Sequence, residues 1–169
     1  IGSVVTDVEL VVDEAPVEDG CGPCTRCQSA CPTGALDVSG VLDANRCLGW
    51  LLQAAGRFPV EFRAALGHRI YGCDDCQEVC PVNDTHPTSS SVAVRITAPP
   101  QNRPVDVIEL LECDDDELMR RHGHWYIPRR RPEYLRRNAL VVLANVVDEP
   151  DDRVRAVVSS ALASESAMV

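Results

Sequence analysis

Several features that mark large classes of protein are scarce or missing in this chain. Aromatic residues make up 4% of its 169 residues, and all sixteen basic residues are arginine, which we attribute to the base composition of the gene. No segment approaches the roughly 18 uninterrupted apolar residues of a membrane-spanning helix, and no secretory signal is present. We therefore expect neither a membrane protein nor a secreted protein, and we expect a cytoplasmic location. Because the first residue is Ile1 and not Met, we expect the chain to be part of a longer protein.

Charge is distributed unevenly along the chain. The net charge is −10, which disfavours nucleic acid as a partner of the surface as a whole. The first 20 residues contain six acidic residues and no basic one, whereas residues 120–137 contain seven arginines and one acid, Glu133. Such asymmetry can create a local basic binding face on an otherwise acidic protein.

Cysteine, in contrast, is abundant, and eight of the nine cysteines fall into two spaced clusters plus one satellite. Residues 21–32 read C-G-P-C-T-R-C-Q-S-A-C-P, the C-x2-C-x2-C-x3-C-P run of bacterial iron–sulfur proteins. Residues 73–81 (C-D-D-C-Q-E-V-C-P) repeat this run in part, and Cys47 stands between the two. Eight thiolates are the number that two four-iron clusters require, so the sequence predicts an electron carrier.

The spacing also predicts which cysteines share a cluster. Three cysteines of such a run bind one cubane, and the fourth, next to proline, ligates the other cluster. Cys80 therefore joins the first cluster, and Cys47 completes the second. The predicted ligands are Cys21, Cys24, Cys27 and Cys80 for the first 4Fe-4S cluster, and Cys31, Cys47, Cys73 and Cys76 for the second. Cys113 is left over and is expected to be an ordinary thiol.

Zinc, disulfide bonds and a cluster-free relic are the alternative explanations of these cysteines. Zinc is usually held by two C-x2-C pairs that are well separated in the sequence, whereas three cysteines here lie within residues 21–27. Disulfide bonds are disfavoured in a cytoplasmic protein. A relic would not be expected to retain all eight cysteines.

The remaining pattern predicts an α+β fold that is mostly α-helical. Residues 4–12 alternate as in a β-strand, and residues 35–42 could pair as a short hairpin around Gly40. Asp43 is expected to cap a helix that continues to about residue 55, and Pro59 to begin one that ends near residue 67. Further helices are expected at 104–112, from Asp114 with Glu117 in a capping-box-like start, at 132–147 and at 151–163.

We expect four parts along the chain. Residues 1–17 would be the terminal strand of a truncated N-terminal domain, and residues 18–87 a bacterial ferredoxin-like double 4Fe-4S domain. Residues 88–104, which are rich in proline and serine, would be a linker. Residues 105–169 would be a helical, HEAT-like region, because a single pair of amphipathic helices is typical of one HEAT-type repeat.

Residues 122–131 (H-G-H-W-Y-I-P-R-R-R) combine cations with two aromatic residues. Arginines contact phosphates, and aromatic rings stack on splayed bases, so an anticodon loop is a suitable partner. The structural alternative is a solvated arginine face with Trp125 and Tyr126 as core anchors, and composition alone favours it. His122 and His124 are expected to be surface residues.

Residues 69–81 (R-I-Y-G-C-D-D-C-Q-E-V-C-P), with Cys47 and the run 21–36, resemble epoxyqueuosine reductase. The resemblance continues in residues 134–140 (Y-L-R-R-N-A-L) and 143–145 (L-A-N). It implies an oxidoreductase of queuosine biosynthesis, which reduces the epoxide of epoxyqueuosine, at the wobble position of certain tRNAs, to the alkene of queuosine. It also implies a cobalamin that an N-terminal domain mainly holds and that receives electrons from the two clusters.

The resemblance implies roles for particular residues. The segment Cys73, Asp74, Asp75 and Cys76 would lie against the cobalamin, although the two acids could equally favour the start of a short helix. The anticodon stem-loop would contact Arg129, Arg130 and Arg131, and more weakly Arg136 and Arg137, which acids such as Glu133 can neutralise along the helix. Trp50 is expected to be a buried aromatic that covers a cluster.

No catalytic acid can be named, because the family's carboxylate proton donor and its cobalamin-binding domain lie upstream of the cysteine run. We therefore expect this chain alone to be inactive, to take electrons from an external donor and to be a monomer. A stand-alone ferredoxin-like carrier without RNA binding is the main alternative, and the helix pair and the arginine-rich segment count against it. A cobalamin-dependent reductive dehalogenase is a further alternative. The string at residues 72–77 and the HEAT-like C-terminal region count against it.

Overall fold

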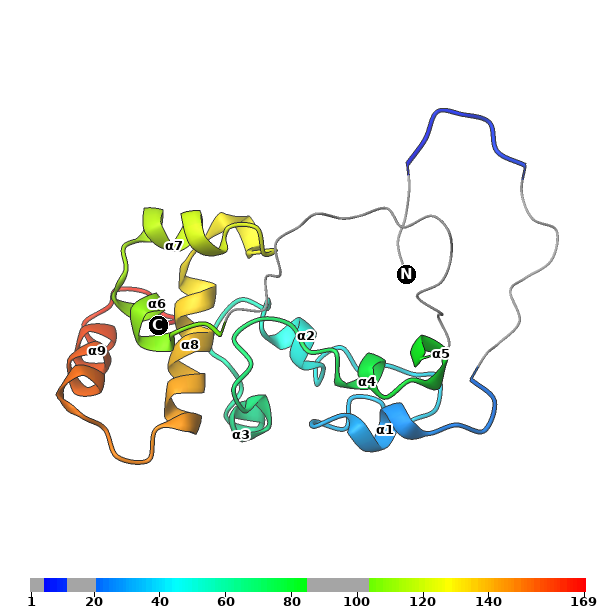
Figure 1. Ribbon diagram of the computed structural model, residues 1–169, viewed down its shortest axis with the longest axis horizontal. Helices are drawn as coiled ribbons and strands as arrows, with labels where there is room; N and C mark the ends of the chain where they lie inside the picture. The colour runs from blue at the N-terminus through cyan, green and yellow to red at the C-terminus, as the bar shows by residue number, and fades with distance from the viewer. Residues whose placement is uncertain (1–4, 12–20, 85–103) are drawn as a thin grey trace.

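The computed structural model describes residues 5–11, 21–84 and 104–169, and within these ranges the chain forms helices and no strand (Figure 1). The cysteine-containing half consists of α1 (Arg26–Ala30), α2 (Leu48–Leu51), the 3-10 helix η1 (Val60–Phe62), α3 (Arg63–Leu66), α4 (Asp75–Glu78) and α5 (Pro81–Asp84). The second half consists of α6 (Val107–Glu112), α7 (Asp115–His122), the 3-10 helix η2 (Pro128–Arg130), α8 (Glu133–Val146) and α9 (Asp152–Leu162). None of the helices in these ranges combines the length and the apolar character that crossing a membrane requires.

The β part of the expected α+β fold is not found in the described residues. Residues 5–11 are exposed and have no regular secondary structure. The chain does turn back around Gly40, where the Asp43 N–H donates to the Ala35 carbonyl (2.8 Å), but no strand ladder forms. The physical reason is that a strand satisfies its backbone only by pairing with a neighbouring strand, and residues 5–11 have none.

Two parts of the expected domain division lie largely outside the described residues. Residues 1–4 and 12–20 belong to the expected terminal strand and the approach to the cysteines, and residues 85–103 contain the expected linker. The boundaries at 17, 87 and 104 therefore stay predictions.

Several predicted helix ends agree with the structure. The Asp114 carboxylate accepts a hydrogen bond from the Glu117 N–H (2.8 Å), which confirms Asp114 as the N-cap of α7. The helix after Pro59 ends at Gly67, whose φ of 59° is a conformation that glycine adopts at little cost. Asp43 instead accepts from the Asn45 N–H (3.0 Å) in a turn, and α2 begins only at Leu48.

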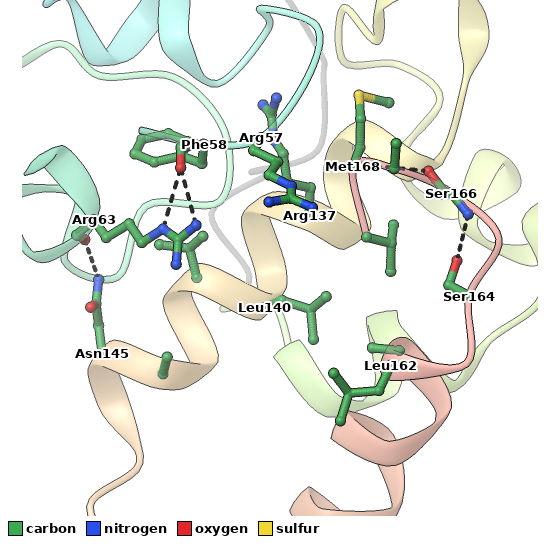
Figure 2. Close-up of a pocket in the computed structure, with 15 residues that line it drawn as sticks. Arg57, Phe58, Arg63, Arg137, Leu140, Asn145, Leu162, Ser164, Ser166 and Met168 are labelled. Atoms are coloured by element: carbon green, nitrogen blue, oxygen red, sulfur yellow. Dashed lines mark hydrogen bonds between the residues drawn. The ribbon is translucent and has the colours of Figure 1, made fainter. Parts of the chain in front are cut away.

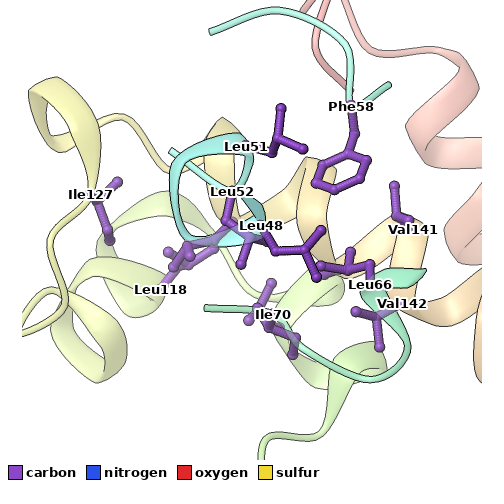
Figure 3. Close-up of a cluster of buried hydrophobic side chains, with 13 residues drawn as sticks. Leu48, Leu51, Leu52, Phe58, Leu66, Ile70, Leu118, Ile127, Val141 and Val142 are labelled. Atoms are coloured by element: carbon purple, nitrogen blue, oxygen red, sulfur yellow. The ribbon is translucent and has the colours of Figure 1, made fainter. Parts of the chain in front are cut away.

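One hydrophobic core runs through both halves of the chain. Figure 3 shows side chains from α2, α3, α7 and α8 converging on it. Its buried members are Leu48, Leu51, Leu52, Phe58, Leu66, Ile70, Leu110, Leu118, Ile127, Leu135, Ala139, Val141 and Val142. Burying aliphatic side chains of this size stabilises the fold by roughly 1.5–3 kcal/mol each before conformational entropy is subtracted. The helical half therefore supports the cysteine-containing half directly.

Helix α8 lies at the boundary between the halves (Figure 1). It packs against α6 on one side and α3 on another, while α6 also packs against α9. Leu135, Ala139 and Val142 form its buried face, whereas Val146 is 52% exposed. The chain thus places α6 in contact with both members of the predicted helix pair, and a HEAT-like pairing of α8 with α9 stays a prediction.

Candidate metal centres

The four cysteines predicted to bind the second cluster line one small cavity of about 30 Å³. They arrive from three segments: Cys31 follows α1, Cys47 is the N-cap of α2, and Cys73 and Cys76 flank the start of α4. All four side chains are half-buried. The rest of the lining is mostly apolar (Pro32, Ala35, Leu36, Leu42 and Leu48), with two polar residues, Thr33 and Asp75. The fold therefore brings together sulfur atoms that are far apart in the sequence.

Polar groups around Cys31 favour its thiolate. Its Sγ accepts a hydrogen bond from the Ala35 N–H (3.2 Å) and lies 3.6 Å from the Thr33 hydroxyl. Partial burial opposes ionisation, but hydrogen bonds from Thr33, Ala35 and Leu36 outweigh it and lower the pKa of Cys31. Thr33 is itself buried and donates to the Arg46 carbonyl (2.6 Å), which fixes its position.

Two other sulfur atoms of this cavity, those of Cys73 and Cys76, disfavour charge unless a cation is present. Burial raises the pKa of Cys73 and Cys76, and repulsion from Cys47 and Cys31 adds to the rise at Cys76. Thiolates gathered in an apolar cavity repel one another, and bound iron removes that repulsion. The donor set and its surroundings therefore fit an iron–sulfur cluster.

The four cysteines of the first set are more open. Cys21 and Cys24 are exposed, and Cys27 and Cys80 are half-buried. Helix α1, which contains Cys27, packs against α4, which precedes Cys80. This packing brings the two segments into one neighbourhood, and the sharing of one cluster by these four cysteines stays a prediction.

The ninth cysteine, Cys113, belongs to neither set. In the described ranges, no three His, Cys, Asp or Glu side chains are close enough to hold a single metal ion. Cys113 lies apart from both sets, at the end of α6, where its Sγ donates to the Leu110 carbonyl (3.3 Å). Burial raises the pKa of Cys113.

A larger groove of about 840 Å³ adjoins the second cysteine set. Cys73 and Asp75 line both the groove and the small cavity, and Asp74 lines the groove alone. Asp74 is exposed and is the N-cap residue of α4, whereas Asp75 accepts a hydrogen bond from Arg69 (2.6 Å). Residues 68–75 line the groove, together with residues of the helical half such as Val105, Trp125 and Val142.

The arginine-rich segment is largely engaged within the protein. Arg120 and Arg121 hydrogen-bond to Glu117 and lower the pKa of that carboxyl to about 2. Arg131 pairs with Glu133. These contacts leave a smaller set of arginines with free charge.

Arg129 and Arg130 form the open part of this segment. Both are exposed, and their φ angles of 52° and 58° lie in the left-handed region. Consecutive non-glycine residues in this conformation are uncommon. Arg130 donates to the Gly123 carbonyl (2.7 Å), and Arg129 makes no ion pair with the described residues.

Trp125 and Tyr126, the aromatic residues beside these arginines, have different roles. Trp125 stacks on Tyr71, with ring centroids 4.9 Å apart, and on His122 at 4.7 Å. It is therefore a partly buried anchor for the segment that leads to Cys73. Tyr126 is 64% exposed, and its N–H donates to the Tyr71 hydroxyl (2.9 Å). His122 is half-buried, contrary to the expectation of a surface residue, because Trp125 covers its ring.

Three sequence-based expectations about single side chains require correction. Trp50 is 53% exposed and does not form the expected buried cover. Arg137 is 3% exposed, and its guanidinium is bound to backbone carbonyls, so it cannot reach a phosphate. Arg136 donates to the carbonyls of residues 111 and 113 and to Asp115, which leaves little of its charge for RNA.

The sequence did not single out several residues that support the cysteines. Thr33 beside Cys31, Arg69 beside Asp75 and Asn138 in the core are the main examples. All three stand in strings that carry the family resemblance, which was the only available signal for them.

Comparison with known proteins agrees with this arrangement. Residues 20–83 match the family model of a 4Fe-4S double cluster binding domain. The chain is 38% identical to the epoxyqueuosine reductase of Vibrio cholerae over 151 residues, covering 89% of this chain and 40% of that protein. It is also 38% identical to that of Bacillus subtilis, covering 88% of this chain and 38% of that protein. The chain thus spans about two-fifths of the length of these relatives.

A solved structure gives a similar result. A crystal structure of epoxyqueuosine reductase with an epoxyqueuosine-modified tRNA-Tyr stem loop superposes with a TM-score of 0.66 at 34% identity. The match covers 85% of this chain and 41% of that one. The likeness therefore extends over both the cysteine-containing half and the helical half.

Proposed function

Because the chain belongs to the epoxyqueuosine reductase family, we propose that it is the electron-relay part of an enzyme that reduces epoxyqueuosine in tRNA to queuosine. Converting the epoxide into an alkene takes two electrons and two protons, and the oxygen leaves as water. The chain's contribution is to hold two 4Fe-4S clusters, which supply single electrons to a cobalamin when all are bound.

The observation that carries this proposal is the position of the second cysteine set. Its cavity shares Cys73 and Asp75 with the large groove. Electrons that leave a cluster held by Cys31, Cys47, Cys73 and Cys76 would therefore enter the groove directly. We place the cobalamin on this side, against the segment from Cys73 to Cys76, with Asp74 as the carboxylate that is open to it.

We place the tRNA on a surface that adjoins the groove, and the exposed arginines support this position. Arg129 and Arg130 are exposed and carry charge that no carboxylate in the described residues neutralises, so they are suited to phosphate contacts. Arg131 is a weaker candidate because it pairs with Glu133. The Tyr71–Trp125 stack connects this arginine segment to the wall of the groove.

The chain supplies relay and binding surfaces but no identified proton donor. We therefore propose that the complete activity requires the cobalamin-binding part that the family resemblance implies, together with an external electron donor. We place the protein in the cytoplasm, where reduced thiols persist, and expect a monomer.

Anaerobic reconstitution with iron and sulfide tests this function. The chain should bind about eight irons, from two clusters of four, and electron paramagnetic resonance (EPR) of the reduced protein should detect two centres. The protein should also bind an epoxyqueuosine-type anticodon stem-loop, and this binding should weaken as the salt concentration rises. Four irons or fewer would refute the relay, and eight irons without RNA binding would favour the stand-alone carrier.

A further inference from the structure

Arg137 on α8 reaches out of the helical half and binds the C-terminal end of α2. Figure 2 shows its side chain beside Phe58, on the face of α8 that meets the cysteine-containing half. Its guanidinium donates to four carbonyls, those of Ala54 (2.5 Å), Gly56 (2.8 Å), Leu52 (2.9 Å) and Leu51 (3.0 Å). These carbonyls belong to the last residue of α2 and to the residues just after it. No following helical turn supplies N–H donors to them, so Arg137 satisfies them.

Asn138 extends this contact to the segment that leads to Cys73. Its Nδ2 donates to the carbonyls of Leu52 (3.0 Å) and Ile70 (3.1 Å), and its Oδ1 accepts from Arg137 (2.8 Å). Asn138 is 1% exposed, so these bonds are shielded from water. The pair therefore joins two segments, one of which begins at Cys47 and the other of which continues into Cys73.

The charge of Arg137 has no anionic partner among the described residues. Arg137 is 3% exposed, and the groups around it are backbone carbonyls, the Asn138 amide and the rings of Phe58 and Tyr134, at 5.8 and 5.6 Å from its Cζ. Buried arginine is usually paired with a carboxylate, because an isolated charge loses its hydration. Arginine nevertheless stays protonated in proteins.

The second cysteine set lies at the other end of α2. This helix has four residues and hence a length of about 6 Å, with Cys47 at its N-terminal end and the Arg137 guanidinium at its C-terminal end. A four-iron cluster with four thiolate ligands carries net negative charge, and reduction adds one more. A cation buried in a poorly screened interior, at the opposite end of a helix this short, stabilises that charge.

We propose that Arg137 and Asn138 are positioning residues for the second cluster, and that Arg137 is also its buried counter-charge, which favours the reduced state. This inference rests on the proposed function, because it requires a 4Fe-4S cluster on the second cysteine set.

Redox titration of the reconstituted chain, followed by EPR, tests the charge. The second centre is first identified as the one that Cys47→Ala removes. Arg137→Gln should lower the midpoint potential of that centre and leave the other unchanged. Arg136→Gln is the matched control, because Arg136 is the adjacent residue of α8 but binds α6 and Asp115; it should move neither potential. An unchanged second potential in Arg137→Gln, or an equal fall in Arg136→Gln, would overturn the proposal.

The positioning role is tested with two variants that keep the positive charge at residue 137. These variants also test the proposal if Arg137→Gln does not fold. Arg137→Lys and Asn138→Ala should speed iron loss from the second centre to a chelator several-fold, with no comparable change in the first. The potential of the second centre should stay near the wild-type value in Arg137→Lys. If both centres lose iron at wild-type rates in these variants, the proposal is wrong.

The wild-type protein separates this inference from the proposed function. If it binds only one cluster, the relay itself fails. If it binds two clusters and the Arg137 and Asn138 variants behave as wild type, the positioning and counter-charge roles fail, and the proposed function stands.

Discussion

Single side chains decide the chemistry of the cysteine cavity. Cys31 has a thiolate that hydrogen bonds favour, whereas burial disfavours the thiolates of Cys73 and Cys76. Cys47 completes the set from a different helix. A cluster must therefore compensate the repulsion that the fold creates, and binding it should be linked to folding of this region.

Replacement of Cys47 by alanine should remove the second cluster alone. The variant should bind about four irons in place of about eight, because each cubane needs its four thiolates. Iron and sulfide analysis with EPR measures this. Cys113→Ala is the control and should retain the wild-type iron content, since its thiol bonds to the Leu110 carbonyl away from both sets. Loss of the first centre in Cys47→Ala would show that the proposed pairing is wrong.

Acidification should destabilise the protein through His122. Burial, and then the positive charges of His124 and Arg121, lower the pKa of His122 in the folded state. Because its unfolded pKa is about 6.5, the folded state loses stability as the pH falls below that value, until the pH passes the folded pKa. His122→Phe, which keeps a ring against Trp125, should reduce the fall in thermal midpoint between pH 7.5 and 5.5. Equal falls in both proteins would contradict this assignment.

Helix α8 is the element on which the two halves depend. Three of its polar side chains bind the carbonyl ends of other helices: Arg136 at the end of α6, Arg137 at the end of α2, and Asn145 at the carbonyls of residues 63 and 67 around α3. Short helices have many unpaired carbonyls for their length. Arg136, Arg137 and Asn145 thus share one role, which is to bind carbonyls that the short helices leave unpaired.

The N-caps of the helical half should each contribute measurably to stability. Asp114→Ala should lower the free energy of unfolding by about 1 kcal/mol, because the Glu117 N–H loses its acceptor. Chemical denaturation followed by circular dichroism measures this. Asp116→Ala, in the same first turn but without a capping bond, is the control and should have a smaller effect. A similar loss in both variants would mean that general charge, and not capping, stabilises α7.

As a whole, the described molecule has one main core that joins its two halves, a smaller cluster of Leu143, Val154 and Val157, and two different surfaces. The core runs from α2 through α8, so the cluster-bearing segments and the arginine segment are held in fixed relation. Tyr71 and Trp125, which stack on each other, both line the groove. A tRNA bound at the arginines would therefore be presented to the side of the molecule where the second cysteine set opens.

RNA binding should depend mainly on two of the seven arginines in residues 120–137. Arg129→Ala with Arg130→Ala should weaken binding of the anticodon stem-loop and reduce the slope of log K against log salt by about 1.4, or about 0.7 for each lost single-strand phosphate contact. Fluorescence anisotropy over a salt series measures both. Arg153→Ala, on α9 and paired with Glu112, is the matched control and should bind as wild type. Equal weakening by the control would indicate non-specific attraction.

Local patterns in the sequence determined a large part of this protein. Spacing and the ligand count of two clusters predicted eight cysteine ligands, because ligands in a tight loop recur at fixed positions along the chain. The four predicted for the second cluster line one cavity. Side-chain caps such as Asp114 were equally accessible, since a cap acts on residues only three positions away. The expected strand at residues 4–12 could not be predicted in this way, because a strand depends on pairing with a segment from elsewhere in the chain.

Only the tertiary structure decided what each arginine does. Arg129 and Arg137 are the same residue type in the same basic stretch, yet one is exposed and the other is enclosed by carbonyls from α2. Those carbonyls lie more than 80 residues earlier in the chain, so no local pattern reports them. Burial is a property of packing between distant segments, and it alone separates a surface charge from an interior one.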